Sequence, residues 1–351
     1  MRGDLLNTLV FGVLPIASTH SLCAHEARNC IASQSRKIFR FILASLILLF
    51  ACSCTHKELC YNHPHITNVK VDFNWTTEPE KVPESMSVYF FKEGSESEPL
   101  RFEFTEPTGG RIRLTPGVYH AVSVNSDERN HAVKDTYDYD SFCVTTKDAS
   151  SVAGLSKFGV APKDLPRAKS AEQERMAVEP NNVWYANARD ISVPDGEDHY
   201  VTLDIKSQLV TYNIYVKNAA NLKWVYGISA SMSGLAGGIH LGSGQLSDER
   251  VTIPFVARWN RDDSTVTGSF TSFGHCPTDT NKHYLKIYAV LADDSYWDFT
   301  YDVTDQVHNA PAGNLITIEL DGLPIPKPVA NGGGFKPTVG DWNSVEIELT
   351  M

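Results

Sequence analysis

Residues 69–75 read Val-Lys-Val-Asp-Phe-Asn-Trp, so apolar and polar side chains alternate along this stretch. Because successive side chains of a β-strand point to opposite faces of a sheet, the alternation places every apolar side chain on one face. Apolar residues spaced every three or four positions, which indicate an amphipathic helix, are almost absent from the chain. The stretch therefore predicts a strand with one buried face.

The same kind of strand signal recurs further along the chain. Residues 88–91, Val-Tyr-Phe-Phe, form a continuous apolar run typical of a strand buried on both faces. Thr115-Pro116-Gly117 supplies a tight turn, because proline presets φ and glycine accepts a positive φ. A second series of alternating strands starts at Val210 and continues to residues 345–349, close to the last residue. The sequence therefore predicts an all-β fold.

Many short strands with turn signals at this spacing favour β-sandwiches over a barrel with a single sheet. We predict two sandwich domains in succession, residues 67–206 and residues 207–351. Between Thr145 and Asn182 the alternation fades, and Ala, Ser, Lys, Pro and Glu become frequent. We expect this segment to be a long irregular excursion that contains a short helix near Ala171–Met176.

The first 53 residues contain the layout of a secretion signal. Three basic residues, Arg36, Lys37 and Arg40, precede an apolar run over residues 41–51. A helix that crosses a membrane needs roughly 20 apolar residues, and this run is about half that length. Residues 1–34 precede the layout, and we expect them to be an upstream extension from a misplaced start codon.

Two cysteines after the apolar run indicate which kind of signal this is. Residues 49–52, Leu-Phe-Ala-Cys, and residues 51–54, Ala-Cys-Ser-Cys, both resemble the lipobox of bacterial lipoproteins, whose cysteine carries the lipid and becomes the new N-terminus. The residues before Cys52 suit cleavage there, whereas the family resemblance described below favours Cys54. We predict lipidation at Cys54 or Cys52 and a lipidated tether over residues 54–66. An ordinary secretion signal with incidental cysteines is the alternative.

The charge of the chain bears on its partners. It has 31 basic and 42 acidic residues, a formal charge of −11, and removal of residues 1–53 takes away five basic and two acidic residues, which leaves about −14. An acidic surface repels nucleic acid, so we expect no nucleic-acid binding. Cys60, Cys143 and Cys276 would remain and are far apart, and no CxxC metal or redox motif is present. We expect no cofactor.

Five segments carry a family resemblance. The most specific is residues 54–65, Cys-Thr-His-Lys-Glu-Leu-Cys-Tyr-Asn-His-Pro-His, and the others are Leu-Thr-Pro-Gly-Val-Tyr at 114–119, Ser-Met-Ser-Gly-Leu-Ala-Gly at 231–237, Asp-Val-Thr-Asp-Gln at 302–306 and Gly-Gly-Gly-Phe-Lys-Pro-Thr-Val-Gly-Asp-Trp at 332–342. They resemble fimbrillin-like lipoproteins of anaerobic gut bacteria, a group largely described only as a domain of unknown function. The resemblance implies two tandem transthyretin-like (Greek-key) sandwiches and a lipid anchor in the cell outer membrane. It also implies an anchor or accessory adhesion subunit of fimbriae.

The resemblance also implies a partner, because a subunit of such fimbriae is completed by a strand from its neighbour, an example of β-augmentation. Stalk subunits first lose their N-terminal strand by cleavage after an arginine. Here the expected first strand, residues 66–75, is followed by residues 76–83, which contain no arginine. This departure favours an anchor over a stalk subunit. We expect Val345, Ile347 and Leu349 to form the strand offered to a fimbrial subunit.

Aromatic pairs provide the alternative function. Trp184-Tyr185, Tyr296-Trp297, and Tyr137 with Tyr139 are candidates for platforms that stack on sugar rings. Aromatic side chains also fill sandwich cores, and we favour this structural role. If the pairs are exposed, the protein would be a surface glycan-binding lipoprotein that recognises a host or bacterial surface ligand.

Motifs for metal binding and catalysis are missing from the sequence. The cysteines and histidines of residues 54–65 match no established zinc motif. The aspartates at 135, 138 and 140 and at 293 and 294 lack the glycine and terminal glutamate of a calcium loop. No GxSxG, HExxH or GxxxxGK[ST] motif is present. We expect neither a metal site nor an enzymatic activity.

Overall fold

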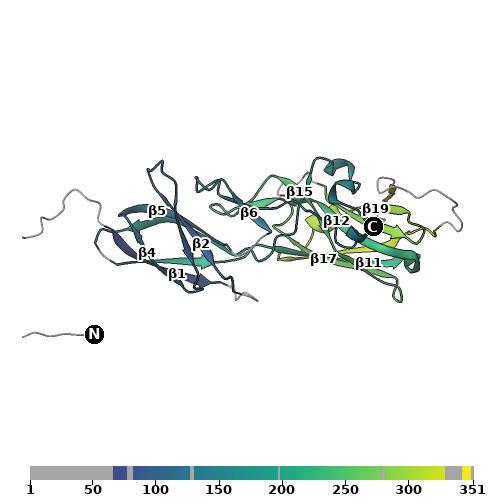
Figure 1. Ribbon diagram of the computed structural model, residues 1–351, viewed down its shortest axis with the longest axis horizontal. Coiled ribbons are helices and arrows are strands. Elements are labelled where there is room, and N and C mark those ends of the chain that lie inside the picture. The colour runs from purple at the N-terminus through teal and green to yellow at the C-terminus, as the bar shows by residue number, and fades with distance from the viewer. Residues whose placement is uncertain are drawn as a thin grey trace, which may run out of the picture. The chain divides into compact units, whose positions relative to one another are not determined.

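The computed structural model of the protein describes residues 66–76, 82–126, 130–196, 198–276, 280, 282–328 and 342–348 (Figure 1). All of them belong to one compact unit, Pro64–Met351. The predicted signal, Cys52 and Cys54, the tether up to residue 65 and Leu349 lie outside the described residues.

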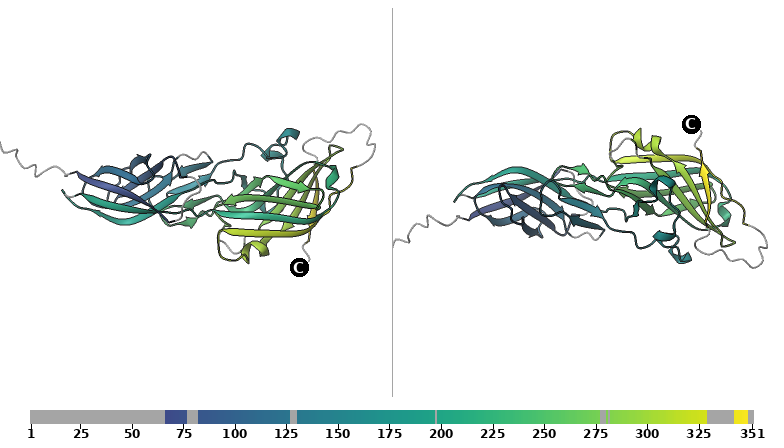
Figure 2. Two further views of the ribbon diagram at one scale, coloured as in Figure 1. Left: turned by 90° about the horizontal axis from the view of Figure 1, so that it is seen from below. Right: turned by 90° about the horizontal axis from the view of Figure 1, so that it is seen from above.

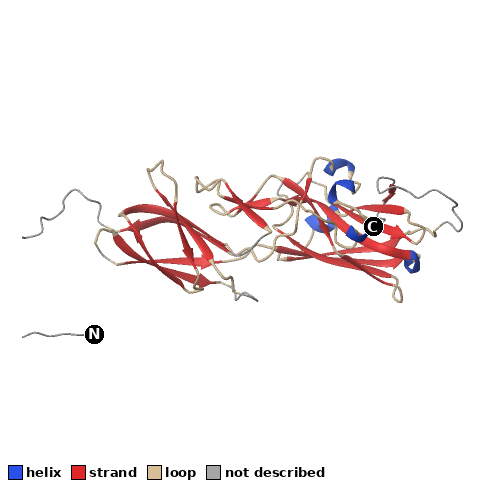
Figure 3. Ribbon diagram, viewed as in Figure 1, coloured by secondary structure: helices blue, strands red, loops and turns tan. Residues whose placement is uncertain are grey.

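Strands make up most of the described residues, which confirms the predicted all-β fold (Figure 3). The helical elements described are the five-residue helix α2 (Thr304–His308) and the 3-10 helices η1 (Ser156–Phe158), η2 (Pro162–Asp164), η3 (Lys169–Ala171) and η4 (Leu222–Trp224). Among the helices that the structure describes, none has the length and apolar character needed to cross a membrane.

The first sandwich consists of two sheets. One has the order β10-β1-β4, formed by β10 (His199–Ile205), β1 (Thr67–Trp75) and β4 (Gly109–Leu114). The other has the order β3-β2-β5-β9, formed by β3 (Leu100–Phe104), β2 (Met86–Lys92), β5 (Gly117–Asn125) and β9 (Tyr185–Val193). Strand β1 pairs in parallel with β10 and antiparallel with β4.

The alternation at residues 69–75 builds the core of this sandwich. Val69, Val71 and Phe73 of β1 are buried between the two sheets, and the Phe73 ring packs edge-on at 5.3 Å from the ring of Phe104 on β3. Burying a side chain of this size contributes about 1.5–3 kcal/mol. The buried face of β1 is therefore the one that the sequence predicts.

The second sandwich is larger. One sheet has the order β16-β17-β11-β20, formed by β16 (Ala257–Asn260), β17 (Thr265–Ser272), β11 (Val210–Ala219) and β20 (Leu315–Leu323). The other has the order β21-β19-β18-β12-β15-β8, formed by β21 (Trp342–Ile347), β19 (Tyr296–Asp302), β18 (Tyr284–Leu291), β12 (Val225–Ala236), β15 (Arg250–Phe255) and β8 (Arg175–Met176). Figure 2 shows β21 in yellow at one side of this sandwich.

A further sheet joins segments from both halves of the sequence. Its order is β14-β13-β7-β6, formed by β14 (Gln245–Leu246), β13 (Gly238–His240), β7 (Cys143–Thr146) and β6 (His131–Lys134). A cluster of buried side chains accompanies it and includes Tyr89, Phe142 and Ile239. The Phe142 ring lies 4.9 Å from the Tyr89 ring, so this cluster packs against the outer face of β2. We call it the bridging cluster.

The excursion between Thr145 and Asn182 covers the outer face of the six-stranded sheet. Its side chains Val152, Leu155 and Leu165 are buried together with Tyr288 of β18. The helix expected near Ala171–Met176 is wrong, since only η3 is helical there and Arg175–Met176 is strand β8.

Tertiary contacts explain this difference. The side chain of Glu174 accepts hydrogen bonds from the backbone N–H of Gly234 at 3.0 Å and from Thr252 Oγ1 at 2.8 Å. Arg175 Nε donates to Glu249 Oε1 at 2.7 Å. These contacts hold the backbone extended beside β15 and override a weak local helix propensity.

Candidate functional site

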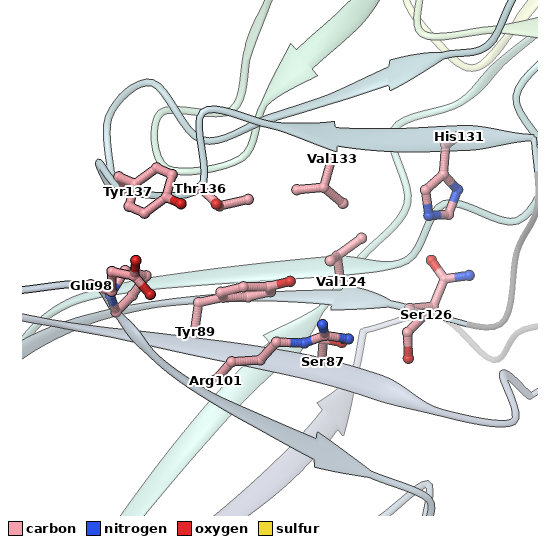
Figure 4. Close-up of a pocket in the computed structure, with 12 residues that line it drawn as sticks. Ser87, Tyr89, Glu98, Arg101, Val124, Ser126, His131, Val133, Thr136 and Tyr137 are labelled. Atoms are coloured by element: carbon pink, nitrogen blue, oxygen red, sulfur yellow. The ribbon is translucent and has the colours of Figure 1, made fainter.

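A polar cleft of about 530 Å³ lies on the outer face of the four-stranded sheet of the first sandwich (Figure 4). Strands β2, β3 and β5 form one wall, and β6 with the turn after it forms the other. The side chains that line it are Ser87, Tyr89, Glu98, Pro99, Arg101, Val124, Asn125, Ser126, His131, Val133, Thr136 and Tyr137. Ser87 and Tyr89 reach it because they alternate along β2 with Val88 and Phe90, which face the core.

The sheet wall of the cleft contains a hydrogen-bonded network centred on Glu103. In the register of β2 and β3, Ser87 lies opposite Glu103 and Tyr89 lies opposite Arg101. Arg101 Nη2 is 3.0 Å from both Ser87 Oγ and Glu103 Oε2, and Ser87 Oγ donates to Glu103 Oε2 at 2.6 Å. Ser126 Oγ donates to Glu103 Oε1. Cross-strand pairing therefore fixes these groups in place.

The protonation states of this wall follow from its contacts. Burial tends to raise the pKa of Glu103, but hydrogen bonds from Ser126, Ser87 and Arg101 together with the Arg101 charge hold it below its usual value. Burial raises the pKa of Tyr89, whose ring lies 5.6 Å from the Arg101 guanidinium. At neutral pH the wall thus contains a charged Arg101–Glu103 pair beside a protonated phenol.

The opposite wall carries an exposed aromatic ring. Tyr137 is 70% exposed, and its side chain and that of Thr136 face the cleft across from Tyr89 (Figure 4). Val133 and Val124 face each other farther along the cleft. The carboxylate of Glu98 lies at the same end as Tyr137. The cleft thus offers aromatic surface, aliphatic surface and several hydrogen-bonding groups.

The structure does not assemble the aromatic pairs at 184–185 and 296–297 into platforms. Tyr185 is 1% exposed and its hydroxyl donates to Gln208, and Tyr296 is 7% exposed. Trp184 and Trp297 are partly buried and pack against the two sandwich cores. Because one member of each pair is buried, neither pair presents two rings to solvent.

The third aromatic pair is divided in the same way. Tyr139 is buried in the bridging cluster, whereas Tyr137 lines the cleft. The sequence therefore named one cleft residue, Tyr137, but missed Ser87, Arg101 and Glu98. For Ser87 on β2 and Arg101 on β3, the alternation of polar with apolar positions was the available signal, whereas Glu98 precedes β3.

The terminal strand β21 lies at the edge of the six-stranded sheet and pairs in parallel with β19. Val345 and Ile347 are partly buried against the core of the second sandwich. Ser344 Oγ donates to Asp298 Oδ1 at 2.5 Å, and Asp298 Oδ2 lies 2.5 Å from Lys286 Nζ. The strand is therefore part of the protein's own fold, and Leu349 lies outside the described residues.

The structure also locates the candidate metal ligands and cysteines that it describes. Among the described residues, no group of three His, Cys, Asp or Glu side chains is arranged to hold a metal ion. Asp138 Oδ2 accepts hydrogen bonds from the backbone and hydroxyl of Ser141, as expected of a turn. Cys143 and Cys276 are buried and free, and burial raises the pKa of the Cys143 thiol to about 11. A thiol with that pKa is protonated and unreactive at neutral pH.

The fold and the cleft define the class of protein: a double β-sandwich with a polar cleft on the outer face of one sheet. Residues 53–256 match the family described as Domain of unknown function (DUF5119). The match covers more than half of the chain, so the chain belongs to this family. It confirms the predicted membership of a family of unknown function. No curated protein matches the sequence.

Solved structures resemble this chain to different degrees. A candidate adhesin from Bacteroides ovatus has a TM-score of 0.56 and 18% identity, over 78% of this chain and 99% of that one. The fimbrial anchor protein Mfa2 from Porphyromonas gingivalis has a TM-score of 0.45 and 13% identity, over 72% of this chain and 90% of that one. A candidate polysaccharide-binding protein from Bacteroides thetaiotaomicron has a TM-score of 0.44 and 9% identity, over 73% and 90%. At this identity, the likeness to the Bacteroides ovatus protein establishes the fold alone.

Proposed function

We propose that the protein is a lipid-anchored surface adhesion subunit that serves as a fimbrial anchor or accessory subunit and contacts its partner through strand β21. The observation that carries the proposal is the position of β21 at the end of the six-stranded sheet, where β19 is its neighbour among the described strands. The backbone groups on the other side of an edge strand can pair with a strand of another chain.

The membrane attachment in this proposal rests on the sequence. Cys54 or Cys52 would carry the lipid, which would insert in the outer membrane at the cell surface. Residues 54–66 would connect this lipid to β1. The fold shared with a candidate adhesin supports a role in adhesion. Mass spectrometry of the N-terminal peptide of the native protein tests the anchor, because acyl chains on either cysteine add a defined mass.

Strand β21 could serve a partner in two ways. It could stay in place and pair along its free edge, or it could leave its own sheet and be donated, as predicted for Val345, Ile347 and Leu349. Donation would break the contacts of Val345 and Ile347 with their own core and the hydrogen bond between Ser344 and Asp298. The two modes therefore differ in whether β21 must be released.

A disulfide staple distinguishes these modes. Thr300 and Glu346 lie opposite each other in the β19–β21 register, and neighbouring strands are close enough for a disulfide. The double variant Thr300→Cys/Glu346→Cys should lock β21 in place. If β21 is donated, the lock should abolish co-purification of companion subunits from outer membranes, and a reducing agent should restore it. If β21 pairs along its edge, the locked protein should retain its partner.

A matched control is available on the other sheet of the same sandwich. Lys217 and Asp321 lie opposite each other in the parallel pair β11–β20, and both are exposed. The double variant Lys217→Cys/Asp321→Cys should leave partner binding unchanged. Deletion of Ser344–Met351 provides the complementary test. If the deleted protein folds and still binds its partner, β21 is not the contact.

A further inference from the structure

The cleft on the first sandwich is independent of β21 and has the size of a small-ligand site. Its volume of about 530 Å³ falls within the roughly 300–1,000 Å³ of typical ligand pockets. It is bounded on one side by a sheet face and on the other by β6 and the turn after it (Figure 4). Polar side chains line both walls, so a ligand in this cleft needs hydrogen-bonding groups on the two sides that face them.

The side chains in the cleft match the chemistry of a sugar. A pyranose ring has apolar C–H faces that pack on aromatic rings and hydroxyl groups that both donate and accept hydrogen bonds. Tyr137 supplies an exposed ring, and Tyr89 supplies a hydroxyl on the opposite wall. Arg101 supplies donors, and Glu98 and the Ser126 hydroxyl, whose own proton is donated to Glu103, supply acceptors. The Arg101 guanidinium has five N–H groups, so its contacts with Ser87 and Glu103 leave others for a ligand.

The charge of the cleft selects among sugars. The positive charge of Arg101 is compensated by Glu103 at 3.0 Å, and Glu98 adds a negative charge. The whole chain has a formal charge of −11. A carboxylated or sulfated sugar would therefore meet a net repulsive field, whereas a neutral sugar would not. Nucleic acid is disfavoured for the same reason.

We propose that this cleft binds a neutral oligosaccharide. Tyr137 stacks on one sugar ring, and Arg101, Ser126 and Glu98 hydrogen-bond its hydroxyl groups. Tyr89, held beside Arg101 by the β2–β3 register, orients the guanidinium and contacts the same ligand. Adhesion through this cleft would recognise a glycan surface, and would not depend on strand contacts of β21.

The first experiment measures binding of the full-length protein to an array of immobilised oligosaccharides. The array carries neutral glucans, mannans, galactans and xylans beside acidic oligosaccharides with uronic acid or sulfate groups, and peptides of mixed sequence. We expect binding to one or more neutral oligosaccharides. Binding to no neutral oligosaccharide, or only to acidic oligosaccharides or peptides, would overturn the proposal.

The second experiment locates the binding site. For the best neutral oligosaccharide of the array, titration calorimetry compares the native protein with Tyr137→Ala and Arg101→Lys. Tyr137→Ala should weaken binding about tenfold, as expected of one lost stacking contact. Arg101→Lys keeps the charge but loses the planar guanidinium, and should weaken binding to a similar extent. Tyr137 is largely exposed, so its substitution leaves the fold intact, which circular dichroism verifies.

Tyr200 provides the matched control. It is 61% exposed and has a lysine, Lys70, at 6.0 Å from its ring, but it lies on β10 in the other sheet. Tyr200→Ala should leave the affinity unchanged. Equal affinity of Tyr137→Ala and the native protein, or an equal loss in Tyr200→Ala, would show that the cleft is not the site. Both outcomes leave the strand proposal unaffected, because β21 is unchanged in these variants.

Discussion

The two sandwiches share one strand order and differ at their edges. The order β10-β1-β4 corresponds to β20-β11-β17, and β3-β2-β5-β9 corresponds to β15-β12-β18-β19. In both, the first and last strands of this common order in the chain, β1 with β10 and β11 with β20, pair in parallel. In the second sandwich β8 and β21 extend the larger sheet beyond β15 and β19, and β16 extends the smaller sheet beyond β17. The comparison shows that one core topology supports two kinds of surface. The first sandwich has a polar cleft on a sheet face, and the second has sheets extended by added edge strands.

Substitution of Phe142 should test how far the sandwiches depend on each other. Its ring is fully buried in the bridging cluster, 4.9 Å from Tyr89 and 6.2 Å from Phe91. Phe142→Ala should lower the free energy of unfolding by about 3–5 kcal/mol, because it opens a cavity. Differential scanning calorimetry should then show two transitions for Phe142→Ala and one for the native protein. A single transition at unchanged temperature would contradict a coupling role.

The second test compares ion pairs of the two sandwiches. Asp298 and Lys286 form a fully buried pair in the second sandwich, whereas Glu103 and Arg101 are half exposed in the first. Asp298→Ala should cost about 3–5 kcal/mol of unfolding free energy, since it leaves a buried charge without its partner. Glu103→Ala should cost about 1 kcal/mol or less, because exposed pairs contribute little. Urea denaturation of both variants measures the difference.

Replacing both partners of the buried pair separates charge from packing. The double variant Lys286→Met/Asp298→Leu removes both charges and should recover most of the lost stability. If the double variant is as unstable as Asp298→Ala, packing and the hydrogen bond from Ser344 dominate, and the contrast between the sandwiches does not arise from charge.

The third test concerns the effect of pH on the stability of the second sandwich. Burial lowers the pKa of His283 to about 4, with a further lowering by the nearby His308 and His275. Its Nδ1 lies 3.2 Å from the Ser233 carbonyl oxygen and its Nε2 lies 3.1 Å from His308 Nε2. Between pH 6.5 and 4 the unfolded chain binds a proton that the folded protein does not. Stability should therefore fall by on the order of 2–3 kcal/mol as the pH decreases through this range.

Urea denaturation at several pH values measures this loss. His283→Gln removes the titrating group, so its stability should change less between pH 6.5 and 4 than that of the native protein. If Phe142→Ala separates two transitions, the pH dependence should appear in the transition of the second sandwich. An equal slope in the native protein and in His283→Gln would assign the pH dependence to other groups.

Local sequence pattern predicted the strands well. The alternation at residues 69–75 identified the buried face of β1, because burial follows directly from the two-residue period of a strand. Val345 and Ile347 likewise fall on one face of β21. The predicted boundary at residues 206–207 stays a prediction, as do the lipidated cysteine and the donated strand.

Long-range contacts explain what the sequence did not reveal. The turn at Thr136 and Tyr137 faces β2 because β6 and β7 pair with each other and β7 pairs with β13, about a hundred residues later. Tyr185 and Tyr296 looked like candidates for sugar stacking, but an aromatic residue on a strand gives no sign of which face the tertiary fold will cover. The helix predicted near Ala171–Met176 is also absent because of a long-range contact, the hydrogen bond from Arg175 to Glu249.

The parallel pairing of β1 with β10 has a mechanical consequence. Residues Val69 to Trp75 pair with His199 to Ile205 on one side, and residues Thr67 to Asp72 pair with β4 on the other. The hydrogen bonds of a ladder run across the strands, so tension along β1, such as the proposed lipid tether would transmit, would load both ladders in shear. Many bonds must then break together instead of opening one at a time. Under the proposed anchoring, a force on the tether would therefore meet a strand that resists being pulled out of the first sandwich.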